Sequence, residues 1–127
     1  MMYALDTNFL MIPQNYGVDV LTELTRLNPS AETVTVPAVV DELRSLAAAG
    51  RGRDNLAAEV GLKLVGIGVT VLPFSAPGSA DDILVALSQE EGAVVCTQDK
   101  ELKQRLAELR RPVVVLRNRS HLEEVSA

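Results

Sequence analysis

The sequence contains one cysteine, one histidine and no tryptophan. A single cysteine, Cys96, excludes an internal disulfide and the clustered cysteine ligands of a structural zinc site. Cys96 lies within the apolar run 93–96, so we expect a small buried side chain in a reducing compartment. The lone histidine, His121, lies in an arginine-rich segment, and we expect it on the surface rather than in catalysis.

Long apolar segments are also missing. No run of residues approaches the roughly 20 apolar positions that a membrane-spanning helix needs. The chain opens without the basic and apolar segments of a secretory signal, so we expect a cytoplasmic protein with no membrane contact. Its 127 residues, 47% of them hydrophobic, suffice for a single domain over residues 1–127 with a sizeable core.

Aromatic side chains are few, and the chain has four: Tyr3, Phe9, Tyr16 and Phe74. Proteins hold single-stranded nucleic acids partly by stacking bases on aromatic rings. With so few rings, stacking should contribute little sequence preference. We expect Tyr16 to be the exposed ring.

The net charge is −5, so the chain lacks the overall basic character that is typical of nucleic-acid-binding domains. Its charges are unevenly distributed, however. Residues 100–119 contain seven basic and two acidic residues, whereas residues 1–99 contain five basic and thirteen acidic residues. Such a division would allow metal ions to bind at the carboxylates and phosphates at the basic segment. A solvated basic helix face would have the same composition.

Short β-rich runs alternate with segments whose apolar residues recur at helical spacing. The β-rich runs cover residues 2–5, 33–36, 69–72, 93–97 and 112–116, and the helical segments include residues 18–25, 39–46 and 56–67. This alternation predicts a three-layer α/β/α fold with a central parallel sheet of about five strands. Pro37 suits the first turn of a helix, and Ser79 can cap a later one. From about Ser120 we expect a short final helix.

Four acidic residues fall where predicted strands give way to helices: Asp6, Glu42, Asp81 and Asp99. The carboxyl ends of parallel strands meet at one edge of a sheet, so all four could reach one crevice. Clustered carboxylates repel one another unless cations neutralise them, and oxygen ligands favour Mg²⁺ or Mn²⁺ over zinc. Each residue also has a simpler explanation. The three aspartates could be helix N-caps, Glu42 could face solvent, and the neighbouring Asp41 or Asp82 could be the true ligand.

The segments around these acids resemble the motifs of the PIN domain, a metal-dependent nuclease fold related to 5′ nucleases. The matching segments are Leu5-Asp6-Thr7-Asn8, Val39-Val40-Asp41-Glu42-Leu43, residues 80–86 and residues 92–99. The resemblance covers nearly the whole chain. It implies that two divalent ions, Mg²⁺ or Mn²⁺, are held by Asp6, Glu42, Asp81 and Asp99, with Asp82 as an alternative. Asn8 and Thr97 would orient ligands or waters behind them.

The resemblance also implies an activity, which is the endonucleolytic hydrolysis of single-stranded or loop RNA to leave 5′-phosphate and 3′-hydroxyl ends. One metal ion would lower the pKa of a bound water, and a second would stabilise the leaving oxygen. Basic residues near the motifs could contact flanking phosphates; these are Arg44, Arg51, Arg53, Lys100, Lys103 and Arg105.

Two local features look closer to free-standing archaeal-type PIN proteins and ribosomal RNA processing nucleases than to VapC-type toxins. They are the Asp81-Asp82 pair and residues 97–103. Processing nucleases often carry a zinc ribbon, which this chain lacks. RNA is the expected partner, and the resemblance also allows a homodimer, an antitoxin or a ribosome-assembly partner. The alternatives are a VapC-type toxin ribonuclease and a PIN fold without turnover that serves as an RNA-binding or assembly module. Asn8 disfavours a phosphotransfer protein, because an Asp-x-Asp phosphatase needs its second acid there.

Overall fold

A computed structural model describes residues 1–49 and 52–126. In this part of the chain, six strands form one sheet in the order β3-β2-β1-β4-β5-β6. The strands are β1 (Met2–Leu5), β2 (Glu32–Thr35), β3 (Thr70–Val71), β4 (Val94–Cys96), β5 (Val113–Arg117) and β6 (His121–Val125). β1 to β5 run parallel, and β6 is antiparallel to β5. The predicted α/β fold with a central parallel sheet is confirmed, with six strands in place of about five.

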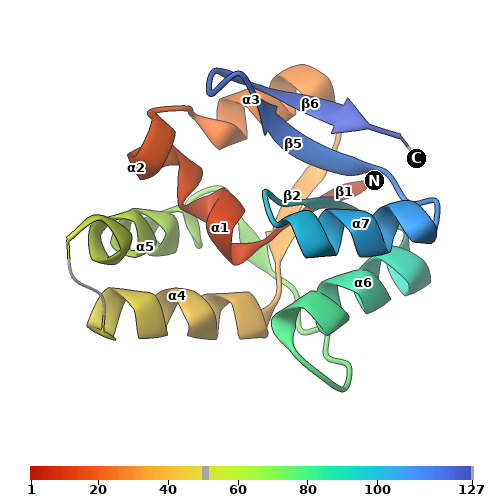
Figure 1. The fold of residues 1–127 in the computed structure, drawn as a ribbon, viewed down its shortest axis with the longest axis horizontal. Helices are drawn as coiled ribbons and strands as arrows, with labels where there is room; N and C mark the ends of the chain where they lie inside the picture. Colours follow the sequence, from red (N-terminus) through yellow and green to blue (C-terminus); the bar gives the residue numbers. More distant parts are fainter. Residues whose placement is uncertain (50–51, 127) are drawn as a thin grey trace.

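Seven helices of the described ranges flank the sheet (Figure 1). They are α1 (Thr7–Leu10), α2 (Ile12–Tyr16), α3 (Val20–Leu27), α4 (Pro37–Ala49), α5 (Arg53–Leu64), α6 (Ala80–Glu91) and α7 (Lys100–Glu108). As predicted, α4 begins at Pro37 and Ser79 caps α6. The sequence pattern does not predict α1 and α2, because four and five residues are too few to show a helical repeat. Each helix in residues 1–49 and 52–126 is too short or too polar to cross a membrane.

The chain moves across the sheet in two directions from β1, which lies near its centre. β2 and β3 lie on one side of β1, and β4 and β5 lie on the other. Right-handed crossovers then place the helices that connect the first three strands on one face, and α6 and α7 on the opposite face. The carboxyl ends of β1 and β4 therefore border the point where the winding direction switches. Parallel α/β sheets carry their ligand sites at such a point.

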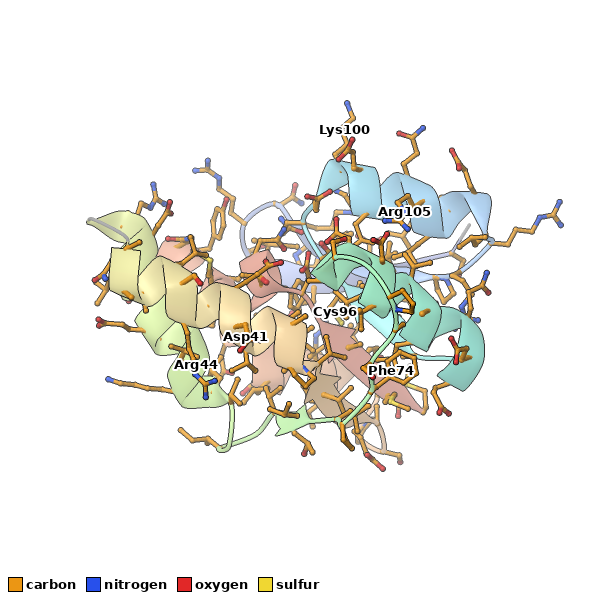
Figure 2. All side chains as sticks on the ribbon, turned by 90° about the horizontal axis from the view of Figure 1, so that it is seen from below. Asp41, Arg44, Phe74, Cys96, Lys100 and Arg105 are labelled. Atoms are coloured by element: carbon orange, nitrogen blue, oxygen red, sulfur yellow. The ribbon has the colours of Figure 1, made fainter. Side chains whose placement is uncertain are left out.

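The core strands are covered on both faces. Residues 3–5 of β1 and 94–96 of β4 are all buried, as expected for the apolar runs of a parallel sheet between two helical layers. Cys96 lies in the middle of the molecule (Figure 2), so the prediction that it is buried is confirmed. Burial raises the pKa of its thiol well above the ordinary value.

Gly61 allows α5 to pack closely on α1. A Cβ atom at this position would lie 3.0 Å from the carbonyl oxygen of Leu10 and 3.3 Å from Cδ2 of Leu43. α5 also packs along α4, so the three helices form one layer. This layer fixes the positions of Thr7 on α1 and Glu42 on α4.

The segment after Ser120 is a strand, so the prediction of a short final helix is wrong. Asn118 and Arg119 have positive φ angles of 52° and 57°, and the N–H of Ser120 donates to the carbonyl of Arg117 at 3.0 Å. This tight turn returns the chain as β6 alongside β5. Within β6, Leu122 alone is fully buried, so the strand has little apolar periodicity from which it could be predicted.

α3 covers the outer edge of β6. Oε1 of Glu23 accepts the N–H of Leu122 at 2.9 Å, and Nη2 of Arg26 donates to the carbonyl of Leu122 at 2.8 Å. Glu23 and Arg26 also pair with each other at 3.1 Å. The N–H and the carbonyl of Leu122, which this edge strand would otherwise offer to another chain, are therefore satisfied within the molecule.

Candidate active site

The carboxyl ends of β1 and β4 are joined through Thr97. Its hydroxyl donates to Oδ2 of Asp6 at 2.7 Å and accepts the N–H of Asp99 at 3.0 Å. Asp6 is 4% exposed and Thr97 is fully buried. Thr97 thus ties the buried carboxylate of Asp6 to the backbone that carries Asp99.

Asn8 makes a second connection between the two strand ends. Its Oδ1 accepts the N–H of Gln98 at 3.0 Å and lies 3.5 Å from the hydroxyl of Thr97. Oε1 of Gln98 accepts the N–H of Leu116 on β5 at 2.8 Å. Asn8 and Thr97, the two residues expected to support the site, therefore hold the loop between β4 and α7 against the start of α1.

Glu42 reaches the same place from α4. The hydroxyl of Thr7 donates to Oε2 of Glu42 at 2.8 Å, while the N–H of Thr7 donates to Oδ1 of Asp6, also at 2.8 Å. One threonine thus bridges two carboxylates. Beside Glu42, a shallow hollow of about 460 Å³ opens along α4. The sequence assigns no role to Thr7, although its position directly after Asp6 at a helix start is a usable signal.

Capping and site formation coincide at two of the aspartates. Asp6 is the N-cap of α1 and Asp99 is the N-cap of α7, where Oδ1 of Asp99 accepts the N–H of Leu102 at 2.9 Å. No described residue donates a hydrogen bond to Oδ2 of Asp99. Capping therefore occupies one oxygen of Asp99 and leaves the second for a ligand.

Asp81 and Asp82 differ in what they bind. The carboxylate of Asp82 accepts the N–H of Ser79 at 2.9 Å and its hydroxyl at 3.1 Å, which completes a capping box at the start of α6. Nη2 of Arg105 lies 2.9 Å from Oδ1 of Asp82, and Figure 2 shows Arg105 between α7 and α6. The backbone hydrogen bond from Ser79, followed by that from Arg105, lowers the pKa of Asp82. Asp82 is thus engaged in a structural role that Asp81 does not share.

Burial and mutual repulsion raise the pKa values of two members of the site. The pKa of Asp6 is raised to about 6, chiefly by loss of hydration. The hydrogen bonds that Asp6 accepts lower this pKa, and the charges of Asp81 and Glu42 raise it. The pKa of Asp81 is also raised, first by burial and then by the charges of Asp99 and Glu42. These four side chains form one electrostatically coupled group, which we name the carboxylate cluster: Asp6, Glu42, Asp81 and Asp99.

The carboxylate cluster has the donor chemistry of a divalent-cation site. It offers carboxylate oxygens, which Mg²⁺ and Mn²⁺ prefer, and the raised pKa of Asp6 is that of a buried acid without a neutralising charge. Within the described residues, no three Asp, Glu, His or Cys side chains are arranged to hold one ion. The residues fit a Mg²⁺ or Mn²⁺ site by chemistry and charge, and the site itself stays a prediction.

The basic residues expected to contact substrate differ in their surroundings. Arg44 lies 3.8 Å from Asp41, and both side chains are on α4 (Figure 2). Arg53, at the start of α5, donates to the carbonyl of Asn15 at 3.3 Å. Arg51 lies outside the described residues.

Two lysines extend the basic surface onto α7. Lys100 begins this helix directly after Asp99 and points away from the rest of the molecule in Figure 2. Neither Lys100 nor Lys103 forms an ion pair with a residue in the described ranges. Their charges are therefore available at the helix that leads away from the carboxylate cluster.

Comparison with known proteins assigns the chain to a family. A family model described as a PIN like domain matches residues 3–119. The chain belongs to the PIN-like domain family. Among curated proteins, Ribonuclease VapC4 of Methanocaldococcus jannaschii is 30% identical over 121 residues, which cover 93% of this chain and 92% of the relative.

Solved structures share this PIN fold. The PIN domain endonuclease Utp24 matches with a TM-score of 0.77 and 25% identity, covering 98% of this chain and 92% of that chain. VapBC2 from Rickettsia felis, bound to a DNA fragment from its promoter, matches with a TM-score of 0.62 and 17% identity, covering 82% of this chain and 92% of that chain. VapBC-1 from nontypeable Haemophilus influenzae has a TM-score of 0.62 and 19% identity, covering 85% of this chain and 94% of that chain. At these lower identities the two VapBC likenesses show the fold alone.

Proposed function

We propose that residues 1–127 act as a single PIN domain that is a divalent-metal-dependent endoribonuclease and hydrolyses phosphodiester bonds of single-stranded RNA. The observation that supports the proposal is the carboxylate cluster at the switch point of the sheet, where the charges of Asp81 and Glu42 raise the pKa of Asp6, and those of Asp99 and Glu42 raise the pKa of Asp81. A fold alone would not require these charges to be placed together.

The members of the cluster are held by the fold in different ways. Thr97, which follows β4, and Thr7, which follows β1, fix the two oxygens of Asp6, and Thr7 also orients Glu42. Asp99 and Asp81 approach from the first residues of α7 and α6. Divalent cations bound among these oxygens would lower the pKa of water to supply hydroxide and would neutralise the leaving oxygen.

The thiol and the imidazole have no role in this chemistry, although the carbonyl of Cys96 accepts the N–H of Asp6 at 3.0 Å and His121 pairs with Arg117 at the carboxyl edge of the sheet. Cys96 is fully buried within β4, and His121 begins β6, where its Nδ1 lies 3.1 Å from the hydroxyl of Ser120. Nucleophilic attack and proton transfer therefore fall to water and the carboxylates.

RNA is supported as the substrate by the relatives, since VapC4 is named a ribonuclease and Utp24 an endonuclease. Positive charge is supplied on three helices, α4, α5 and α7, by Arg44, Arg53, Lys100 and Lys103. Phosphates on either side of the cleaved bond would lie against these residues. The products would carry 5′-phosphate and 3′-hydroxyl ends.

The test is cleavage of a 5′-labelled single-stranded RNA by the purified protein with Mg²⁺ or Mn²⁺ and with a chelator. We expect metal-dependent cleavage by the wild type and loss of at least about 100-fold in rate for Asp6→Asn and Asp99→Asn, because each removes a charged ligand. Thermal melts would show that both variants stay folded. Duplex RNA and single-stranded DNA serve as comparison substrates.

Asp41→Asn is the matched control for Glu42→Gln, since both residues lie on α4 and Asp41 pairs only with the exposed Arg44 among the described residues. We expect the first variant to cleave normally and the second to lose activity. If the wild type and the Asp6 and Asp99 variants gave equal residual cleavage, the nuclease proposal would be wrong. Metal-independent RNA binding without cleavage would then support a non-catalytic RNA-binding module.

A VapC-type toxin is a second candidate, because the archaeal relative at 30% identity carries the VapC name. In that setting, expression of the wild type in a bacterial host would stop growth, and expression of Asp6→Asn would not. Cleavage by the purified protein without any effect on growth would instead favour a role in RNA processing.

A further inference from the structure

One exposed aromatic side chain lies under a guanidinium group that comes from a distant part of the chain. Tyr16, the last residue of α2, is 40% exposed. The guanidinium carbon of Arg119 lies 5.7 Å from the centre of its ring. The two side chains form a cation–π pair that faces solvent.

This pair lies at the same edge of the sheet as the carboxylate cluster. β5 runs parallel to β4 and β1, so its end at Arg117 and the turn that follows belong to the carboxyl edge. Figure 1 shows this turn, between β5 and β6, close to α2. Nine residues, all but Met11 helical, lie between Asp6 and Tyr16, so the ten steps along α1 and α2 make a path of about 15 Å at 1.5 Å per residue.

The turn between β5 and β6 requires a positive φ at position 119 but does not require an arginine there. Arg119 has a φ of 57°, in the left-handed region that glycine adopts at much lower cost. Asn118, with a φ of 52°, is a residue that tolerates this region. A glycine at position 119 would build the same turn, so what this position gains from arginine is the side chain over Tyr16.

A second arginine increases the positive charge beside the ring. Arg53 donates to the carbonyl of Asn15, the residue before Tyr16, at 3.3 Å. In residues 1–49 and 52–126, neither Arg53 nor Arg119 forms an ion pair with an acidic side chain. A partly exposed aromatic ring, a planar guanidinium and unpaired positive charge are features with which proteins hold an unpaired base and its phosphates.

We propose that Tyr16 and Arg119 form a stacking site for one unpaired base of the RNA, a short distance along the strand from the bond at the carboxylate cluster. Arg53 contacts the adjoining phosphate. This inference rests on the proposed function, and it identifies where the strand lies beyond the cleaved bond. It also explains why the substrate must be single-stranded, since a base within a duplex presents no free face.

RNA binding in an Asp6→Asn background, measured by fluorescence anisotropy with a short labelled single strand, tests the inference. Tyr16→Ala should weaken binding about 5- to 30-fold, as expected for the loss of one stacked base. Tyr16→Phe should bind normally, because it retains the ring. Leu109→Ala removes an exposed apolar side chain at the end of α7 and is the control that should bind like its parent.

Arg119→Gly distinguishes a role of Arg119 in RNA binding from a role in stabilising the fold. Glycine relieves the positive φ, so this variant should melt no lower than its parent while binding RNA more weakly. An RNA that lacks the base at the stacked position should bind the parent more weakly than the intact RNA does. The same abasic RNA should bind Tyr16→Ala as tightly as the intact RNA binds that variant.

The outcomes distinguish the two proposals. If the wild type cleaves RNA but all Tyr16 and Arg119 variants bind it as tightly as their parent, the stacking site is wrong and the nuclease proposal stands. If the wild type neither cleaves nor binds single-stranded RNA, both are wrong.

Discussion

Asp6 is the residue at which burial and charge conflict most strongly. Its pKa is raised from 3.8 to about 6, so the folded protein retains a proton in a pH range where the unfolded chain releases it. The stability that this proton contributes is complete below about pH 4 and is lost as the pH rises through 6. Above that pH, the ionised carboxylate costs up to about 3 kcal/mol unless a cation neutralises it.

Asp6→Asn should therefore stabilise the metal-free protein at neutral pH. We expect a melting temperature a few degrees above that of the wild type at pH 7.5 in a chelator, and a smaller gain at pH 5. Melts followed by circular dichroism would measure both. Asp41→Asn, a change at an exposed residue, should keep the pH dependence of the wild type. A variant that melts below the wild type at pH 7.5 would contradict the raised pKa.

Single residues of the site could be predicted where the strand ends fix them. Asp6 directly follows the β-rich run 2–5, and Asp99 follows the apolar run 93–96 after two polar residues. The place of both aspartates at the edge of the sheet therefore follows from the sequence. The double role of Thr7 could not be predicted, because it depends on the distance between α1 and α4. The sequence likewise could not decide between Asp81 and Asp82, because either residue could have formed the capping contact at the start of α6 that Asp82 makes.

At the scale of single elements, the start of α6 is built around Asp82. Its carboxylate accepts hydrogen bonds from Ser79 and pairs with Arg105. Gly78, with a φ of 110°, lies so close that a Cβ atom there would collide with the Asp82 carboxylate. This compact cap holds Asp81, the preceding residue, toward the cluster.

Asp82→Ala and Asp81→Asn should thus have opposite effects. The first should lower the melting temperature by a few degrees through loss of the cap, with cleavage within a few-fold of the wild type. The second should reduce cleavage at least about 100-fold with little change in melting temperature. Parallel melting and cleavage assays would decide, and the reverse result would identify Asp82 as the ligand.

The contact between α3 and β6 gives a second prediction for single elements. Glu23→Ala would leave the N–H of Leu122 without its acceptor, at a cost of about 1 kcal/mol, while Arg26 would keep its hydrogen bond to the carbonyl of Leu122. Urea unfolding would measure this loss, and light scattering should report faster aggregation through the uncovered edge. Glu90→Ala, on the exposed side of α6, should change neither.

Helices and strands could be predicted best where their apolar residues recur over several turns or positions. α4, α5 and the buried parallel strands carry repeats of several apolar residues, and the sequence locates them within a few positions. β6 could not be predicted, because it buries one leucine fully and follows a turn formed by Asn118 and Arg119 without glycine. The sequence also could not show that α3 would close its edge.

At the scale of the whole molecule, cation binding should appear as global stability. An ion that binds the folded state alone adds about 2.7 kcal/mol at 100 times its dissociation constant. We expect Mg²⁺ or Mn²⁺ to raise the melting temperature of the wild type in a saturable way. Asp99→Asn should respond much less, and Asp41→Asn should respond like the wild type. Equal responses from all three proteins would mean that the ions bind elsewhere.

The antiparallel direction of β6 also determines where the ends of the chain lie. Val125 pairs with Val113 at the amino edge of the sheet, the edge at which Met2 begins β1, and Figure 1 shows the two termini near each other. Three strand spacings, about 14 Å, separate them across the sheet. An affinity tag, a fused domain or a surface linker attached at either end would therefore extend away from the carboxylate cluster. The protein can be tethered by one end or by both while the edge that would receive a nucleic-acid strand faces open solution.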